Sequence, residues 1–128
     1  MKQSTIALVE TDILIRYPLA LYLRDCGYSV LEASTLEEAR QLATTADLAI
    51  DIFLLDVASL GDAGFALAQE LRQLNRDWEI LTIGSVKRAV STAADLCEEG
   101  PDPSHAADHE NVLALIQKRL MMREKRPA

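Results

Sequence analysis

The chain has 128 residues, 49% of them hydrophobic, which is enough to bury the core of one domain without disulfides or metals. Its formal net charge of -7, from 20 acidic and 13 basic residues, argues against direct binding of nucleic acid, whose phosphates such a surface would repel. No apolar run reaches the roughly 18 residues of a membrane span, and residues 1–5 lack the layout of a signal peptide.

The two cysteines, Cys26 and Cys97, have no metal-binding spacing and form no disulfide framework. We therefore expect reduced thiols, a cytoplasmic location and no contact with a membrane. Basic residues gather in the last segment, where we interpret them as a solvated helix end with a favourable dipole interaction: Lys118, Arg119, Arg123, Lys125 and Arg126.

Strands and helices alternate from the start of the chain. A short run rich in β-branched residues predicts a buried strand over 5–9. From Asp12 the apolar residues recur at helical spacing, and Gly27 stands where a helix C-terminus favours a left-handed residue. Pro18 lies inside this helix and is expected to bend it. A second strand is predicted over 28–33.

The middle of the chain repeats this alternation. Thr35 and Glu38 have the spacing of a capping box, which predicts the start of a helix. Residues 49–55 are apolar at nearly every position, as is typical of a central strand in a parallel sheet. Apolar residues from Phe65 to Leu74 then indicate a third helix.

The last third predicts a strand, a helix, a weak strand and a final helix, over residues 79–83, 87–97, 102–105 and about 110–122. Such βα repeats with short connections favour a parallel sheet with helices on both faces. Because we find no linker or repeat, we expect a single domain over 1–128, with a core of about 4–122 and a basic tail over 123–128.

In a sheet of this kind the functional crevice lies beyond the carboxyl ends of the strands. Glu10 follows the first strand, Asp12 comes two residues later, and Asp56 ends the central strand. Neighbouring carboxylates repel one another, and Mg²⁺ held by oxygen ligands would relieve that repulsion. Taken singly, each acid could instead cap a helix or lie in a solvated loop.

At these positions the sequence resembles the receiver domain of two-component response regulators over nearly its whole length. The most specific stretch is a strand ending in Asp56 with Gly64 eight residues on. The matching stretches are Ala7-Leu8-Val9-Glu10-Thr11-Asp12 with Arg16, Gly27-Tyr28-Ser29-Val30-Leu31-Glu32-Ala33, Phe53-Leu54-Leu55-Asp56-Val57, and Gly61-Asp62-Ala63-Gly64-Phe65.

The resemblance implies a flavodoxin-like (βα)5 fold with strand order 2-1-3-4-5 and a weak fifth strand. It implies that a histidine kinase or phosphotransfer protein phosphorylates Asp56, with Mg²⁺ held by Glu10, Asp12 and Asp56. It also implies a downstream partner protein, and the family commonly forms homodimers through its last helices.

Two further positions carry the family's phosphate contacts. The switch hydroxyl falls on Thr82, with Ser85 as the alternative register. The usual lysine of the fifth strand is missing, because one register places His105 there and the other Ala107. A histidine near its ordinary pKa would be only partly charged at pH 7.

Other departures from the family pattern would make this chain an atypical receiver. The usual adjacent acidic pair reads Glu10-Thr11, and Leu60 replaces the proline of the loop after Asp56. No aromatic residue follows Trp78, so the family's aromatic switch on the fifth strand is missing.

Three functions remain open from the sequence. The leading hypothesis is a receiver that accepts a phosphoryl group on Asp56, has no enzymatic activity of its own and signals through a partner protein. The second is a pseudo-receiver that binds its partner without phosphorylation. A small phosphatase-type enzyme with Asp56 as nucleophile is disfavoured, because Ala58 stands where a second acid would be needed.

Overall fold

Four strands of five residues each form a parallel sheet in the order β2-β1-β3-β4. The structure is a computed structural model, which describes residues 5–45, 48–84 and 86–99. The strands are β1 (Thr5–Val9), β2 (Ser29–Ala33), β3 (Ile52–Asp56) and β4 (Glu79–Ile83). The helices are α1 (Ile13–Asp25), α2 (Leu36–Thr44), α3 (Val57–Leu60), α4 (Asp62–Leu74) and α5 (Val86–Glu99).

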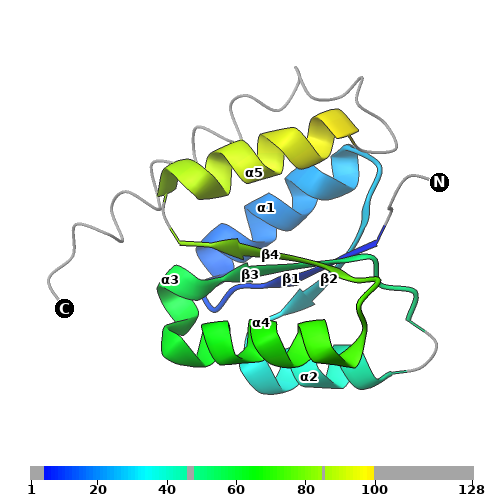
Figure 1. The fold of residues 1–128 in the computed structure, drawn as a ribbon. Helices are drawn as coiled ribbons and strands as arrows, with labels where there is room; N and C mark the ends of the chain where they lie inside the picture. Colours follow the sequence, from blue (N-terminus) through cyan, green and yellow to red (C-terminus); the bar gives the residue numbers. More distant parts are fainter. Residues whose placement is uncertain (1–4, 46–47, 85, 100–128) are drawn as a thin grey trace, which may run out of the picture.

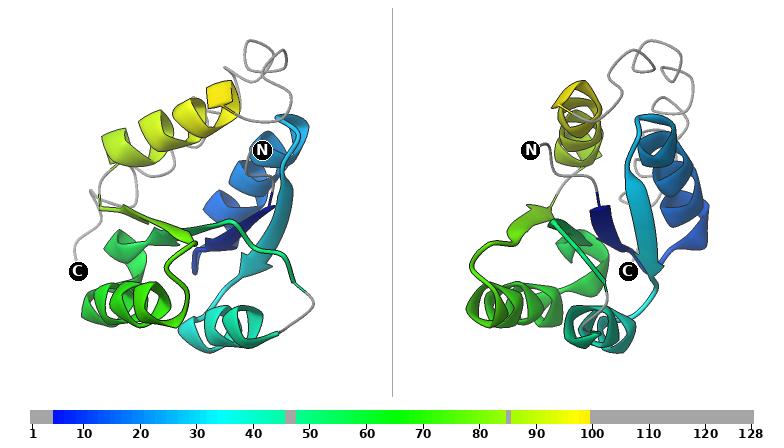
Figure 2. Two further views of the ribbon diagram at one scale, coloured as in Figure 1. Left: turned by 45° about the vertical axis from the view of Figure 1, so that its right-hand side comes forward. Right: turned by 90° about the vertical axis from the view of Figure 1, so that its right-hand side faces the viewer.

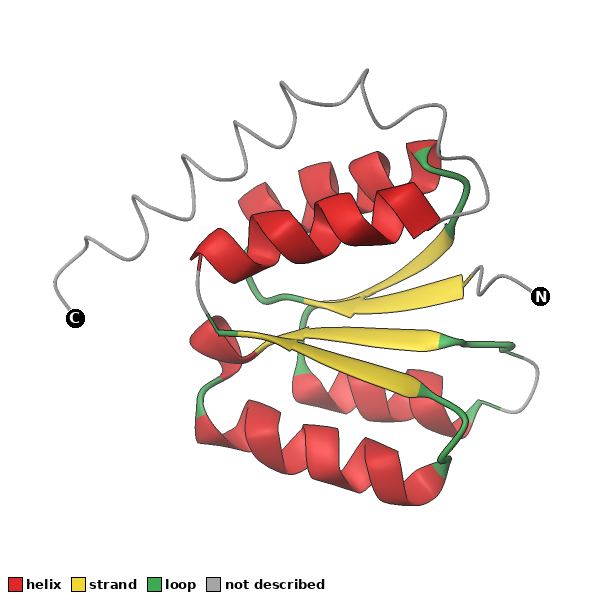
Figure 3. Ribbon diagram, turned by 45° about the horizontal axis from the view of Figure 1, so that its top comes forward, coloured by secondary structure: helices red, strands yellow, loops and turns green. Residues whose placement is uncertain are grey.

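Helices cover both faces of this sheet (Figure 1). α1 and α5 lie on one face and α2 and α4 on the other, an arrangement that the turned views of Figures 2 and 3 also show. The α/β class, the flavodoxin-like layering and the strand order 2-1-3-4 are therefore confirmed. The expected fifth strand at 102–105, the helix at 110–122 and the basic tail lie outside the described residues.

Side-chain alternation along β3 divides the core into two clusters. Ile52 and Leu54 pack toward α1 and α5, whereas Phe53 and Leu55 pack toward α2 and α4. All positions of β3 are buried, as expected for the central strand, but the strand begins three residues later than the predicted start at residue 49 and includes Asp56. Among the described residues, no helix is long and apolar enough to cross a membrane.

Capping residues define both ends of α1. The Asp12 carboxylate accepts a hydrogen bond from the Leu14 amide at 2.9 Å, and the helix runs through Pro18. At its C-terminus Gly27 has φ +98°, and the Tyr28 amide donates to the Leu23 carbonyl at 3.2 Å. This is a Schellman motif, in which the expected glycine turns the chain into β2.

The segment after Asp56 is helical, whereas the family pattern led us to expect a loop there. Residues 57–60 form the short helix α3, and Gly61 at φ +68° separates it from α4. On α4 the buried face holds Gly64, Leu67, Ala68 and Leu71, whereas Phe65 and Leu74 are exposed. The apolar residues that predicted this helix therefore do not all lie on its buried face.

The expectation that the cysteines would stay unpaired is wrong for this structure. Cys26 at the end of α1 and Cys97 in the last turn of α5 form a disulfide, with a Cα–Cα distance of 5.2 Å. They are separated by 71 residues, so sequence spacing could not reveal the pairing. The disulfide results from the packing of α1 beside α5. In the same region, burial raises the pKa of the Tyr22 phenol, and the negative charge of Glu98 contributes to this shift.

Candidate functional site

The carboxyl ends of β1 and β3 bring two buried acids to one edge of the sheet. Val9 pairs with Leu55, so Glu10 and Asp56 are the next residues of the two neighbouring strands. Glu10 is 1% exposed and Asp56 4% exposed. Acidic side chains are rarely buried to this extent unless they are paired, so their position marks this edge as specialised.

Backbone hydrogen bonds fix the position of Glu10. Its amide donates to the Ala33 carbonyl of β2 at 3.0 Å, which extends the pairing of the strands by one residue. Its Oε1 accepts a hydrogen bond from the Asp12 amide at 3.1 Å, which closes the tight turn into α1. Glu10 is therefore held at the edge by both of its flanking elements.

Asp12 serves as the N-cap of α1. The Asp12 Oδ1 that accepts from Leu14 is committed to the end of the helix, and the side chain is half-buried. This is the helix-cap interpretation that the sequence left open beside metal binding. A capping carboxylate has a second oxygen, so this role does not by itself exclude Asp12 from a cation.

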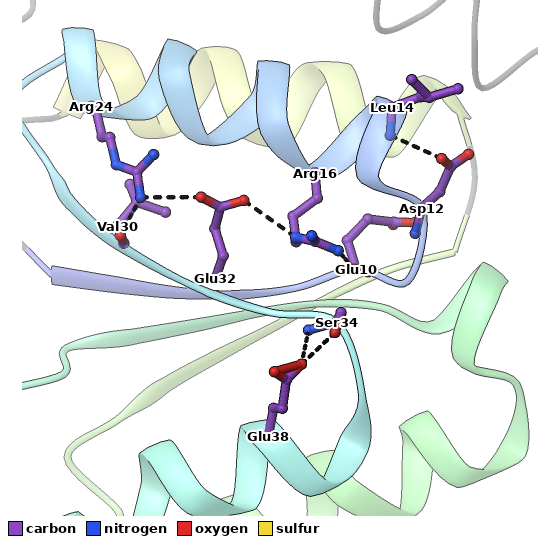
Figure 4. A network of polar contacts seen from close by, with 9 residues as sticks. All are labelled: Glu10, Asp12, Leu14, Arg16, Arg24, Val30, Glu32, Ser34 and Glu38. Atoms are coloured by element: carbon purple, nitrogen blue, oxygen red, sulfur yellow. Dashed lines mark hydrogen bonds and ion pairs between the residues drawn. The ribbon is translucent and has the colours of Figure 1, made fainter.

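An ion-pair network connects α1 to β2 beside these acids (Figure 4). Arg16 donates to the Glu10 carbonyl at 3.0 Å and to the Glu32 carboxylate at 3.2 Å. Arg24 donates to the other oxygen of Glu32 at 3.2 Å and to the Val30 carbonyl at 2.8 Å. Sequence reasoning assigned no role to Glu32, although the two arginines eight residues apart on α1 were a usable signal.

Thr82 is not the residue of β4 that pairs with Asp56; it precedes that residue by one position. In the pairing of β3 with β4, Thr82 faces Leu55 and Ile83 faces Asp56. Leu81 and Ile83 pack with the α1/α5 cluster and Ile80 with the other, so alternation places Thr82 toward α2 and α4. Ser85 and His105 lie outside the described residues.

The pair of acids is compatible with Mg²⁺. Within residues 5–45, 48–84 and 86–99, no group of three His, Cys, Asp or Glu side chains could hold a metal ion. Mg²⁺ needs only one or two carboxylates when waters and phosphate oxygens complete its octahedron. Glu10 and Asp56, as buried oxygen donors on adjacent strand ends, meet that requirement.

An apolar surface on α1 adjoins this edge. Four large hydrophobic residues on the outer side of the helix are 40–56% exposed: Ile13, Leu14, Tyr17 and Leu21. The first two follow Asp12 directly, so the surface begins beside the acids and continues away along the helix.

Comparison with solved structures identifies the fold. The chain resembles the signal receiver domain of a protein from Vibrio parahaemolyticus, with a TM-score of 0.55 and 20% sequence identity. The match covers 95% of this chain and 95% of that domain. At this identity the likeness establishes the fold, and it confirms the receiver-type fold expected from the sequence.

Comparison with characterised sequences gives a weaker likeness. A cyclic di-GMP phosphodiesterase from Thermotoga maritima is 28% identical over an alignment of 97 positions, and the match covers 71% of this chain and 25% of that protein. The chain therefore spans only a quarter of the length of this relative. No family model matches the chain.

Proposed function

We propose that this chain is a receiver-type signalling module that accepts a phosphoryl group on Asp56 and acts through contact with another protein. The observation that supports this most directly is the pair of buried carboxylates, Glu10 and Asp56, at neighbouring strand ends within a receiver fold. The proposed module works in the cytoplasm and has no enzymatic activity of its own.

In the proposed chemistry a carboxylate oxygen of Asp56 attacks the phosphorus of a phosphohistidine on a kinase or phosphotransfer protein. The P–N bond breaks, the histidine nitrogen takes up a proton, and Asp56 carries an acyl phosphate. Glu10 and Asp56 would hold Mg²⁺, with Asp12 as a further oxygen donor. When bound, the cation supplies positive charge against the phosphoryl oxygens.

The phosphodonor protein has to reach this edge of the sheet, and the apolar surface of α1 is a suitable docking site for it. Ile13 and Leu14 directly follow Asp12, so a partner covering them would lie beside the end of the sheet that holds Glu10 and Asp56. Thr82 and His105 remain proposed phosphate contacts. For Thr82 to turn toward Asp56, the backbone at the end of β4 would have to change its conformation. Self-association through the last helices also remains a proposal.

A pseudo-receiver is the second candidate, and two observations favour it. The Asp12 carboxylate caps α1, and the pairing of β4 turns Thr82 away from Asp56. Regulatory coupling typically amounts to about 1–3 kcal/mol, so losing a few contacts would abolish switching without disturbing the fold. A phosphatase-type enzyme has no comparable support.

A heteronuclear NMR titration separates the two candidates. Mg²⁺ and then beryllofluoride, a phosphoryl mimic, are added to the wild-type protein and to Asp56→Asn. The receiver predicts amide shifts at Glu10, Asp56 and the end of β4 that are lost in the variant. No response at millimolar Mg²⁺ and saturating beryllofluoride would establish the pseudo-receiver instead.

A further inference from the structure

Helix α5 is attached to the rest of the domain by two adjacent links near its C-terminus. The Cys26–Cys97 disulfide connects it to the end of α1 across 71 residues of sequence. One residue earlier, the buried Tyr28 hydroxyl donates to the Leu96 carbonyl at 2.6 Å. Both partners of α5 belong to the Schellman turn between α1 and β2, so the two links share one rigid anchor.

The other end of α5 lies at the candidate site. α5 begins at Val86, three residues after Ile83, and Ile83 pairs with Asp56. A helix of 14 residues is about 20 Å long, so α5 extends from the acidic edge of the sheet to its opposite edge. The disulfide therefore fixes the far end of an element whose near end adjoins Asp56.

The two cysteines are placed so that the bond can form and break without unfolding. Both are fully buried among the apolar side chains of the α1/α5 cluster, where a reduced thiol is as compatible as a disulfide. Their Cα–Cα distance of 5.2 Å lies in the range that a disulfide spans without backbone movement. The neighbours Gly27 and Glu98 are exposed, so the bond lies close to the surface, and local opening of the last turn of α5 gives reagents access to it.

We propose that Cys26 and Cys97 are a reversible redox pair whose oxidation clamps α5 onto α1. Oxidation proceeds by exchange with a low-molecular-weight disulfide through a mixed disulfide: two protein thiols give one protein disulfide, and the reagent leaves as two thiols. The reverse exchange with a dithiol releases the clamp. In the reduced state the packing of α5 and the Tyr28 hydrogen bond still hold this end of the helix.

The cellular meaning of the pair rests on the proposed function, because a receiver in the cytoplasm works in a reducing compartment. Disulfides there are usually transient and redox-sensing rather than structural. The pair would then be reduced at rest and would close under oxidative conditions. The clamp itself does not depend on phosphorylation, so it is testable without a kinase.

Hydrogen exchange of the full chain, measured in oxidised and reduced glutathione buffers, tests the clamp. In the oxidised buffer we expect the intact mass to fall by two hydrogens and both cysteines to resist alkylation in denaturant. The amides of α5 near Ala93 to Cys97 should then exchange at least about tenfold more slowly than in the reduced protein. The amides of α4, on the opposite face of the sheet, serve as the internal control and should change much less.

The double variant Cys26→Ala/Cys97→Ala is the matched control and should exchange at the reduced rate in both buffers. Should this variant not fold, the wild type with and without a dithiol decides alone. Two alkylatable thiols in the oxidising buffer would overturn the proposal, as would a disulfide that leaves α5 exchange unchanged. Neither readout involves Asp56, so a failed phosphorylation experiment and a failed clamp are distinguishable.

Discussion

Single carboxylates at this edge of the sheet have different roles that follow from their hydrogen bonds. Glu38 is fully exposed, yet it accepts hydrogen bonds from the side chain and the backbone of Ser34, which lower its pKa below the ordinary value of 4.5. These bonds favour the charged form, so they stabilise the start of α2 at neutral pH.

The pKa of Glu38 leads to a prediction about acid stability. A lowered pKa in the folded state contributes stability above pH 4.5 that is lost as the pH falls through the lowered value. NMR titration should give Glu38 a midpoint below 4.5, and Ser34→Ala should raise it toward 4.5, because the hydrogen bond from the Ser34 hydroxyl, the largest cause of the lowered pKa, is then lost while the backbone N–H of residue 34 still donates. An unchanged midpoint in Ser34→Ala would contradict this cause.

Arg16 is the residue that supports Glu10 from α1. Its side chain is 14% exposed and donates to both Glu10 and Glu32. We expect Arg16→Ala to lower the free energy of unfolding by about 1–3 kcal/mol in urea denaturation, because two partly buried acceptors lose a charged donor. Arg40→Ala is the control: Arg40 is 41% exposed in its pair with Glu70, and its loss should cost less than about 1 kcal/mol. Equal losses would argue against a supporting role for Arg16.

At the scale of elements, the segment 57–64 sets the shape of the chain after Asp56. An added Cβ at Gly64 would lie 2.8 Å from the Leu60 Cβ and 3.3 Å from Val57 Cγ1. α3 and α4 can therefore approach each other only because residue 64 has no side chain. This contact gives the glycine eight residues after Asp56 a packing role.

Gly64→Ala should destabilise the protein by about 1–3 kcal/mol through overpacking, even though alanine is the better helix former. Its amide shifts should change over α3, next to Asp56. Gly84→Ala is the matched control, because its Cβ would meet Val57 Cγ2 at 3.9 Å, an ordinary van der Waals contact. Urea denaturation of both variants measures the two changes in stability. A Gly64→Ala variant more stable than the wild type would show that α3 can move to make room for the added methyl group.

The outer face of α1 offers a second test at the scale of elements. Leu14→Ser should slow phosphorylation by a protein phosphodonor at least about tenfold, because one anchor of an interface often contributes more than 1 kcal/mol. Phosphorylation by a small-molecule donor should stay unchanged. Leu74→Ser is the control, since Leu74 on α4 is 56% exposed like Leu14. An equal loss in both variants would exclude α1 as the docking surface.

At the scale of the whole molecule, the sequence predicted what local patterns determine. β1 was predicted with its bounds, because a buried parallel strand needs a continuous apolar run. Asp12, Thr35 and Gly27 marked helix ends correctly, because capping is a local interaction. The convergence of Glu10 and Asp56 followed from the edge rule for parallel sheets.

What the sequence could not predict depends on contacts between distant segments. The Cys26–Cys97 bond requires α5 to pack beside α1, which no spacing reveals. The face of Thr82 depends on the register of β4 against β3, and a slip by one residue reverses it. α3 has only four residues, too few to show a helical period.

Phosphorylation of Asp56 is tested most directly by intact-mass spectrometry with phosphoramidate, a small donor with the P–N bond of phosphohistidine. Wild type, Asp56→Asn and Asp62→Asn are incubated with it and Mg²⁺; Asp62 is an exposed aspartate in the same segment. We predict one added phosphoryl group on the wild type and on Asp62→Asn, and none on Asp56→Asn. A wild type that gains no phosphoryl group, or an Asp56→Asn variant that still does, would contradict the assignment of Asp56 as phosphoacceptor.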